Sequence, residues 1–363
     1  MRVELVKKNE YELMIKCANE WFSFQHEKSF DFLKIHPKLY KKTADYYLYT
    51  YFLKTDENDL VGLFSAYPIS YDDLNLLCIG TVTINPKYRN QGCLKFMFDY
   101  IDKFLSINYD FTFLLGENVR YQRYGFYKTG LKKRYSILKK NLPSNDKIKL
   151  ELAKPKDNDI LYDFYQESNN KVIRRKDLFY DTVTARNTEA YLVYSKDLLV
   201  GYLLYNNERQ QVFEIMISDD LFYGALLEIS NLKDHQISLS IELDFDSHQN
   251  QLLKRVYDNV MIIGVANLKI NDFVGTLNKM VKNKKTTLKG SIIFSIEDTN
   301  YEFLVEDQIT IKKTNKKGTI ISLFEFYEIL FSFGINDKKY DNPLLKELFP
   351  IIIPGSLSTI DKI

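Results

Sequence analysis

The segment around residue 89 combines an arginine, a glycine and a helix start in a way typical of anion-binding loops. Thr81-Val82-Thr83-Ile84 is a β-branched run, and Pro86 ends it because proline removes a donor from the strand ladder. The chain then reads Arg89-Asn90-Gln91-Gly92-Cys93-Leu94-Lys95. From 94 to 105 apolar residues recur every three or four positions, which predicts an amphipathic helix. Free N–H groups in its first turn, the Arg89 charge and the close approach that glycine permits would bind a pyrophosphate.

A second group of reactive side chains follows about thirty residues later. Phe111–Leu115 is predicted to be a strand, and Gly116, Glu117 and then Tyr121-Gln122-Arg123-Tyr124-Gly125-Phe126 follow it. Glu117 can act as a general base. Glu117 can equally cap a helix or form an ion pair, so both interpretations stay open.

Together these segments resemble the GNAT superfamily of N-acetyltransferases, whose acyl-CoA motif reads Gln/Arg-x-x-Gly-x-Gly/Ala. Leu94 departs from the small residue usual at the last motif position. The approach Ile79-Gly80-Thr81-Val82, the Tyr-x-Arg-Tyr-Gly-Phe segment and the three-part length are similar to the enhanced-intracellular-survival (Eis) branch of that superfamily.

The resemblance implies an α+β protein with tandem GNAT-like α/β domains, the second degenerate, followed by a sterol-carrier-protein-like domain. It implies that Tyr121 protonates the leaving thiolate and that the α-carboxylate of Ile363 is the general base, although the family usually ends in Phe. It also implies a homo-oligomer, a hexamer in that family. The residues that it implies for acetyl-CoA binding are Val82, Thr83, Ile84, Arg89, Asn90, Gln91, Gly92, Cys93, Leu94, Lys95, Gly116 and Glu117.

The chemistry of amine acylation is consistent with these roles. A substrate amine with a pKa near ~10 is mostly protonated at neutral pH, so a base must remove a proton before attack. The acetyl carbonyl needs one fixed N–H donor, for which the Ile84 backbone is the candidate. We expect a cationic acceptor: an aminoglycoside, a polyamine or a lysine amine of a peptide. Transfer of a longer acyl or aminoacyl group, or CoA sensing without catalysis, are the alternatives.

An aromatic stretch near the N-terminus has two interpretations. Its residues, with Glu20 and Asp31 beside them, could wall an amine-binding pocket, or they could be ordinary core. The aromatic members are Trp21, Phe22, Phe24, Phe30 and Phe32.

Composition excludes several other classes. The 50 Lys and Arg residues against 48 Asp and Glu leave a net charge of +2, which argues against a nucleic-acid binder. No apolar run approaches the roughly 18–20 residues that cross a bilayer, and the N-terminus lacks a signal-peptide core. The three cysteines form no CxxC pair and the four histidines have no ligand spacing, so we expect no metal and a reduced, cytoplasmic location.

Polar, proline-containing stretches at 139–147 and 153–159 and a softer joint at 254–259 divide the chain. We therefore predict an acetyl-CoA-binding domain at 1–138, a degenerate copy at 139–260 and a third domain at 261–363. Residues 58–67 and 196–205 form a faint repeat of a polar turn and a Gly-containing strand. Acidic Ser218-Asp219-Asp220 stands in the second copy where the first has its arginine loop, so phosphate binding belongs to the first.

The third segment is predicted to mix helices at 272–281, 322–331 and 344–349 with strands at 291–296, 301–305 and 308–311. Its tail stays apolar to the last residue, which predicts that the tail docks on the protein.

Overall fold

A computed structural model describes residues 1–71, 73–116, 118–143, 148–167, 172–234, 238–244, 247–331 and 342–349. Within these ranges the strands form one twelve-stranded sheet and a separate four-stranded sheet. The mixed α/β architecture agrees with tandem GNAT-like units. Glu117 and Ile363, the two candidate bases, both lie outside the described residues.

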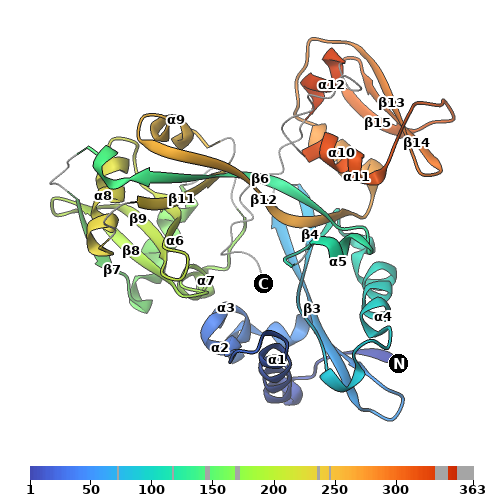
Figure 1. Ribbon diagram of the computed structural model, residues 1–363, viewed down its shortest axis with the longest axis horizontal. Coiled ribbons are helices and arrows are strands. Elements are labelled where there is room, and N and C mark those ends of the chain that lie inside the picture. Colours follow the sequence, from blue (N-terminus) through green and yellow to red (C-terminus); the bar gives the residue numbers. More distant parts are fainter. Residues whose placement is uncertain are drawn as a thin grey trace.

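The first lobe is built from strands and helices of the N-terminal third (Figure 1). Its strands are β1 (Arg2–Leu5), β2 (Thr50–Lys54), β3 (Leu60–Tyr71), β4 (Leu74–Ile84) and β5 (Phe111–Leu114). Its helices are α1 (Tyr11–His26), α2 (Phe32–Ile35), α3 (Pro37–Tyr40), α4 (Cys93–Tyr100) and α5 (Asn118–Gln122). One buried cluster packs α1 against a face of this sheet, and another packs α4 and Tyr121 on the opposite face.

The second lobe repeats the helix-covered sheet. Its strands are β7 (Ile148–Leu152), β8 (Thr188–Ser195), β9 (Leu198–Asn206), β10 (Gln211–Met216) and β11 (Ser238–Asp244). Its helices are α6 (Asn158–Gln166), α7 (Phe179–Val183), α8 (Phe222–Leu232) and α9 (Gln249–Leu253). The strands β3–β4 and β9–β10 fall on the two copies of the predicted repeat, which confirms those strands.

Two long strands join the lobes (Figure 1). β6 (Tyr127–Leu138) pairs with β11 of the second lobe and with β12 (Tyr257–Ile270), and β12 in turn pairs with β5 of the first lobe. The sheet order is therefore β1-β2-β3-β4-β5-β12-β6-β11-β10-β9-β8-β7. The predicted division at 138 coincides with the end of β6, whereas the division at 260 falls inside β12.

The third unit carries the smaller sheet. Its strands are β13 (Gly290–Ile296), β14 (Thr299–Val305), β15 (Ile309–Lys313) and β16 (Thr319–Ile321), and its helices are α10 (Phe273–Val281), α11 (Leu323–Phe331) and α12 (Pro343–Leu348). These elements confirm the predicted helices and strands of the segment. Its apolar residues belong to the same buried cluster as α1, so the unit packs on the first lobe.

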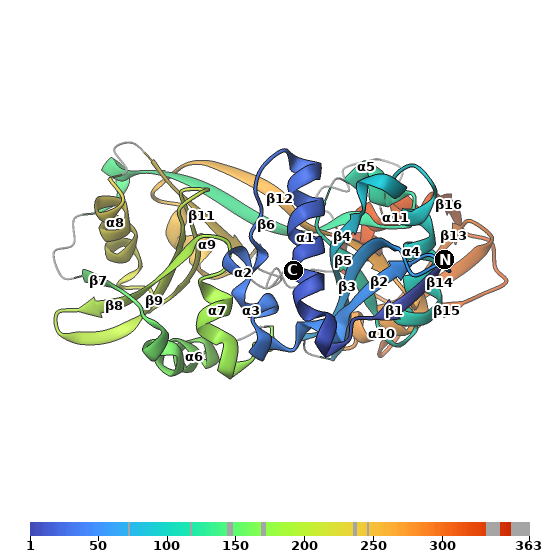
Figure 2. The same cartoon turned by 90° about the horizontal axis from the view of Figure 1, so that it is seen from below.

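Figure 2, turned by 90°, shows α1 running between the two lobes, with α2 and α3 beside α7 of the second lobe. The Arg186 N–H donates to the Ile35 carbonyl at 2.7 Å and Lys41 pairs with Asp181 at 2.5 Å, so the lobes contact each other directly there. In the described ranges, the model contains no helix with the length and apolar character that crossing a membrane requires.

Candidate active site

β4 separates from β5 in the middle of the first lobe. The two strands pair in parallel from Leu76–Phe111 to Ile79–Leu114, where the pairing ends. Just beyond, the β3–β4 register shifts by one extra residue on β4, and Thr81 adopts a left-handed φ of 49°. Such a bulge bends the strand. Among the described residues, the C-terminal part of β4 therefore has no strand partner on the β5 side.

The opened edge offers a backbone donor at Ile84. The Asn85 N–H donates to the Val61 carbonyl at 2.9 Å. Because hydrogen-bonded and non-bonded pairs alternate in antiparallel strands, the adjacent pair, Ile84 with Gly62, is non-bonded. The Ile84 N–H and C=O thus face the side that β5 has left. Thr83 is only 2 % exposed. It forms the next hydrogen-bonded pair, with Leu63 of β3, so its backbone N–H and C=O face β3 and not the opened side.

The predicted anion loop leads into α4 as expected. Gly92 has a φ of 76° and precedes the helix, and the Phe96 N–H makes the first intrahelical bond, to the Gly92 carbonyl at 3.1 Å. The N–H groups of Cys93, Leu94 and Lys95 come before that bond and have no intrahelical acceptor. Their orientation suits a phosphate.

Arg89 stands beside this helix start with spare hydrogen-bonding capacity. Its Nε donates to the Ile84 carbonyl at 3.4 Å, and its guanidinium lies 5.0 Å from the Phe24 ring centroid. Its Nη2 is buried with no hydrogen-bond partner among the described residues. An orphaned cationic donor next to free N–H groups fits a CoA pyrophosphate.

Other side chains of the loop are engaged elsewhere. The Lys95 ammonium pairs with Asp99 one turn along α4, at 2.5 Å. The Gln91 amide donates to the Lys87 carbonyl, at 3.2 Å, and Asn90 has a left-handed φ of 61°. The buried Cys93 thiol donates to the Tyr88 carbonyl, and burial raises its pKa. Cys93 is therefore no thiolate nucleophile, and these residues offer a ligand mainly their backbone.

Tyr121 sits on α5 below the opened edge. Its ring is 9 % exposed and meets Phe98 of α4 edge-to-face, with centroids 5.7 Å apart. Gly116 has a φ of 148°, and a Cβ there would lie 2.5 Å from Tyr121 Cε2. The Gly116 carbonyl accepts from Asn267 Nδ2 of β12 at 3.2 Å. Gly116 thus makes room for the Tyr121 ring, and a strand from far along the chain holds the turn.

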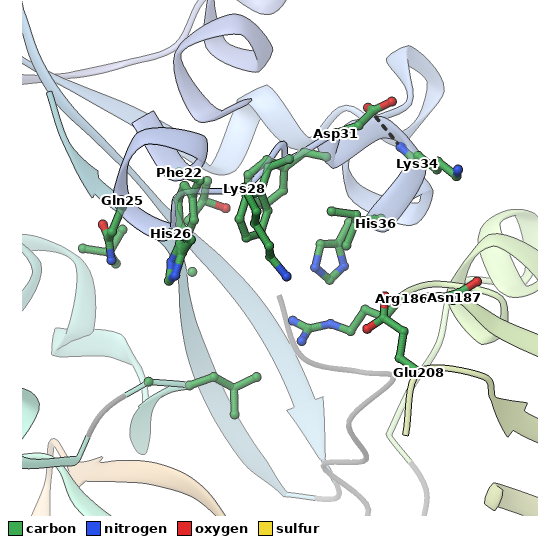
Figure 3. Close-up of a pocket in the computed structure, with 18 of the residues that line it drawn as sticks. Phe22, Gln25, His26, Lys28, Asp31, Lys34, His36, Arg186, Asn187 and Glu208 are labelled. Atoms are coloured by element: carbon green, nitrogen blue, oxygen red, sulfur yellow. Dashed lines mark hydrogen bonds between the residues drawn. The ribbon is translucent and has the colours of Figure 1, made fainter. Parts of the chain in front are cut away.

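A cavity of about 1070 Å³ opens between the two lobes (Figure 3). Of the residues predicted to act or bind, Val82, Gly116 and Tyr121 line it. Thr83, Ile84 and the loop 89–95 do not line it. The aromatic stretch divides: Phe22, Phe30 and Phe32 line the cavity with Asp31, whereas Trp21 is buried in the core.

The sequence analysis does not predict that the second lobe contributes to the lining of this cavity. The lining residues of that lobe lie between Thr184 and Phe213. Arg186 is the notable member. It and Asn187 are consecutive left-handed residues, with φ of 57° and 60°, and burial lowers the Arg186 pKa to about 10. No motif marks this turn, so only the juxtaposition of the lobes identifies it.

His36 is a second unpredicted member of the lining. It is 5 % exposed, its Nδ1 has no partner among the described residues, and its ring stacks on Phe32. Burial, with the nearby charges of Arg186 and Lys38, holds its pKa well below the ordinary value. It is neutral at physiological pH.

No group of three His, Cys, Asp or Glu side chains in the described ranges could hold a metal ion.

Comparison with solved structures gives the fold its name. A conserved protein of unknown function from Enterococcus faecalis V583, a probable N-acyltransferase, is similar at a TM-score of 0.65 and 16 % identity. A GCN5-related N-acetyltransferase from Kribbella flavida scores 0.62 at 11 % identity, and Eis1 from Mycobacterium abscessus 0.60 at 14 %. Each similarity covers 91 % of this chain and 89 % of the other. The chain has the fold of the GCN5-related N-acetyltransferases. No family model and no curated protein matches the sequence.

Proposed function

We propose that the protein is an acetyl-CoA-dependent N-acyltransferase that joins its acyl group to an amine bound between the lobes. The observation that carries this proposal is the opened edge of β4, which lies near both the free helix N-terminus of α4 and the large cavity that Tyr121 lines. This arrangement fits an extended thioester whose phosphates and acyl group lie at opposite ends.

Each group has a task in that reaction. The first-turn N–H groups of α4 and the Arg89 guanidinium hold the pyrophosphate. The Ile84 N–H faces the side of β4 where the thioester carbonyl would lie and stabilises the oxyanion formed on attack. Tyr121 donates a proton to the departing thiolate. The base that deprotonates the amine is the Ile363 carboxylate, with Glu117 as the rival.

We further propose the Eis-type layout for the whole chain, with a sterol-carrier-protein-like third unit. The similarity to Eis1, which extends over 91 % of this chain, supports a common three-part arrangement. In such an arrangement the end of the third unit reaches the first lobe.

The test is CoA-thiol release from acetyl-CoA with a panel of amines, for the native chain and for a chain with a short C-terminal extension. We expect the extension to abolish turnover while acetyl-CoA binding, measured by calorimetry, survives. Equal turnover in both proteins would assign the base to Glu117. Absence of turnover with any amine, despite CoA binding, would contradict the transferase proposal and favour a CoA sensor, whereas preference for long-chain CoA would replace the acetyl donor.

A further inference from the structure

The cavity between the lobes is lined by an excess of positive charge. Among the described lining residues, five are Lys or Arg and two are carboxylates. The cations are Lys28, Lys34, Arg120, Arg186 and Arg209, and the carboxylates are Asp31 and Glu208. A cavity lined mainly by one sign of charge concentrates ligands of the opposite sign and repels polycations.

Among the described residues, no carboxylate forms an ion pair with any of these cations. Salt bridges between described residues include none of the five. Asp31 instead caps α2 by accepting from the Lys34 backbone N–H at 3.3 Å. Arg186 is the most enclosed of the five, and its buried Nε has no hydrogen-bond partner within the described ranges. Desolvation of an unpaired guanidinium is costly, so a bound anion would stabilise it.

The side chains converge on one space. In Figure 3, Lys28 from the first lobe and Arg186 from the second point toward each other, with the ring of His36 beside them. The proposed phosphate-binding groups, Arg89 and the first turn of α4, do not line this cavity. CoA phosphates bound there would not contact Lys28 or Arg186. These two cations therefore remain available to bind another anion.

We propose that the acceptor is an amine that also carries an anionic group, a carboxylate or a phosphate, bound by Arg186 with Lys28 at the cavity entrance. This inference rests on the proposed function and differs from the cationic amine that the sequence leads us to expect. A planar guanidinium binds either anion through two parallel hydrogen bonds. The acceptor's free amine would then extend toward Tyr121 and Val82, which line the same cavity.

The test compares pairs of amines that differ only in the anion. Ornithine, lysine and tyrosine are each assayed against their decarboxylated amines, and glucosamine 6-phosphate against glucosamine. We expect kcat/KM for CoA release to be about tenfold to a hundredfold higher for the anionic member. The carboxylate and phosphate arms distinguish the two sources of the anion. Equal or better turnover of the amines without an anion would overturn the inference and leave the transferase function intact.

Variants of Arg186 test whether this residue causes the preference for the anionic amine. Arg186→Met should remove the preference for the anionic member, Arg186→Lys should restore part of it, and Arg255→Met, on an exposed arginine outside the cavity lining, should leave it unchanged. Loss of acetyl-CoA affinity in Arg186→Met would instead assign Arg186 to the cofactor and overturn the inference.

Binding is measured separately, so that the preference for an anionic ligand can be tested even if the protein is not a transferase. Calorimetry with the N-acetylated acids and N-acetylated amines should show the same preference and the same dependence on Arg186, even if no amine is turned over. Absence of that preference in binding and in turnover would overturn the inference.

Discussion

Tyr121 owes its position to a residue without a side chain. Its ring occupies the volume that a Cβ on Gly116 would need, and it meets the Phe98 ring edge-to-face. A residue with a methyl group at 116 would push the phenol away from the opened strand. The proposed proton donor is thus positioned by packing.

Removing only the phenol oxygen tests that role. We expect Tyr121→Phe to lower kcat about a hundredfold, the smaller end of what general acid catalysis contributes. The dissociation constant for acetyl-CoA should change by less than about twofold, because the phosphate-binding groups lie elsewhere. Tyr124→Phe is the matched control, since Tyr124 stacks on the same Phe98 at 4.3 Å but does not line the cavity. Equal losses in both variants would argue against a proton donor.

His36 links stability to pH. Its pKa lies well below the ordinary value in the folded protein, because burial and the charges of Arg186 and Lys38 disfavour the imidazolium, while in the unfolded chain it is near 6.5. Below about pH 6.5 the unfolded chain therefore binds a proton that the folded one does not. The free energy of unfolding is therefore highest above that pH with respect to His36, and it decreases as the pH falls below it.

The slope reaches at most about 1.4 kcal/mol per pH unit for one proton. We expect the midpoint urea concentration to decrease as the pH is lowered from 7.5 to 5.5. The decrease should be smaller in His36→Phe, which retains a ring on Phe32. Identical pH profiles for the two proteins would show that His36 is not the group responsible.

At the residue scale, the sequence predicts what local chemistry specifies and misses what only the tertiary arrangement creates. The Arg89–Gly92 loop is visible because a strand end, a glycine and a helix start follow one another along the chain. Arg186 carries no such signal, since its partners in the cavity are about 150 positions away in sequence. Nothing local indicates that Asn267 supports Gly116.

At the scale of elements, most helices and strands are predictable from periodicity, but strand partners are not. The apolar run at 260–265 suggests the start of a third segment, whereas it is the middle of β12. A strand's sequence records its burial pattern and not its neighbours, so its insertion between β5 and β6 was not predicted. The helix after the anion loop is α-helical only to Tyr100 and continues as a π-helix over Ile101–Leu105.

The attachment of α10 to β5 depends on one buried carboxylate. Asp110 accepts from Lys279 Nζ at 2.8 and 2.9 Å and from the Asn75 N–H at 2.8 Å. We expect Asp110→Ala to lower the free energy of unfolding by about 2 kcal/mol, because an ion pair and a charge-assisted hydrogen bond are lost together. Urea denaturation followed by circular dichroism measures it.

The control is a neighbouring ion pair in the solvent. Lys282, at the end of α10, pairs with Asp73 between β3 and β4, and the two side chains are 65 % and 64 % exposed. Lys282→Ala should therefore cost less than about 1 kcal/mol. Similar costs for the two substitutions would mean that Asp110 is not the anchor.

At the scale of the whole molecule, the bridge between the lobes leaves apolar surface bare. Val260, Met261 and Ile262 of β12 are 38 %, 47 % and 55 % exposed. Because consecutive strand residues point to opposite faces, both faces of β12 are partly exposed there. Exposed apolar surface of this kind is typical of contacts between proteins.

The homo-oligomer that the resemblance implies would cover it. We expect light scattering to give a mass above one chain for the native protein and a lower mass for Ile262→Glu. Ile320→Glu, on an 81 % exposed isoleucine of β16, is the matched control and should keep the native mass. A monomeric native protein, or the same mass for all three, would contradict this expectation.

The position of β12 also dictates when the protein can become complete during its synthesis. β5 and β6 belong to the first half of the chain, yet the strand that lies between them ends at Ile270. Until that residue has left the ribosome, β5 and β6 each keep one unpaired strand edge. Such edges favour association with other chains. The half of the chain that we propose binds acetyl-CoA is thus among the first parts to be made and among the last to be finished, and a nascent chain arrested before β12 would need protection from a chaperone.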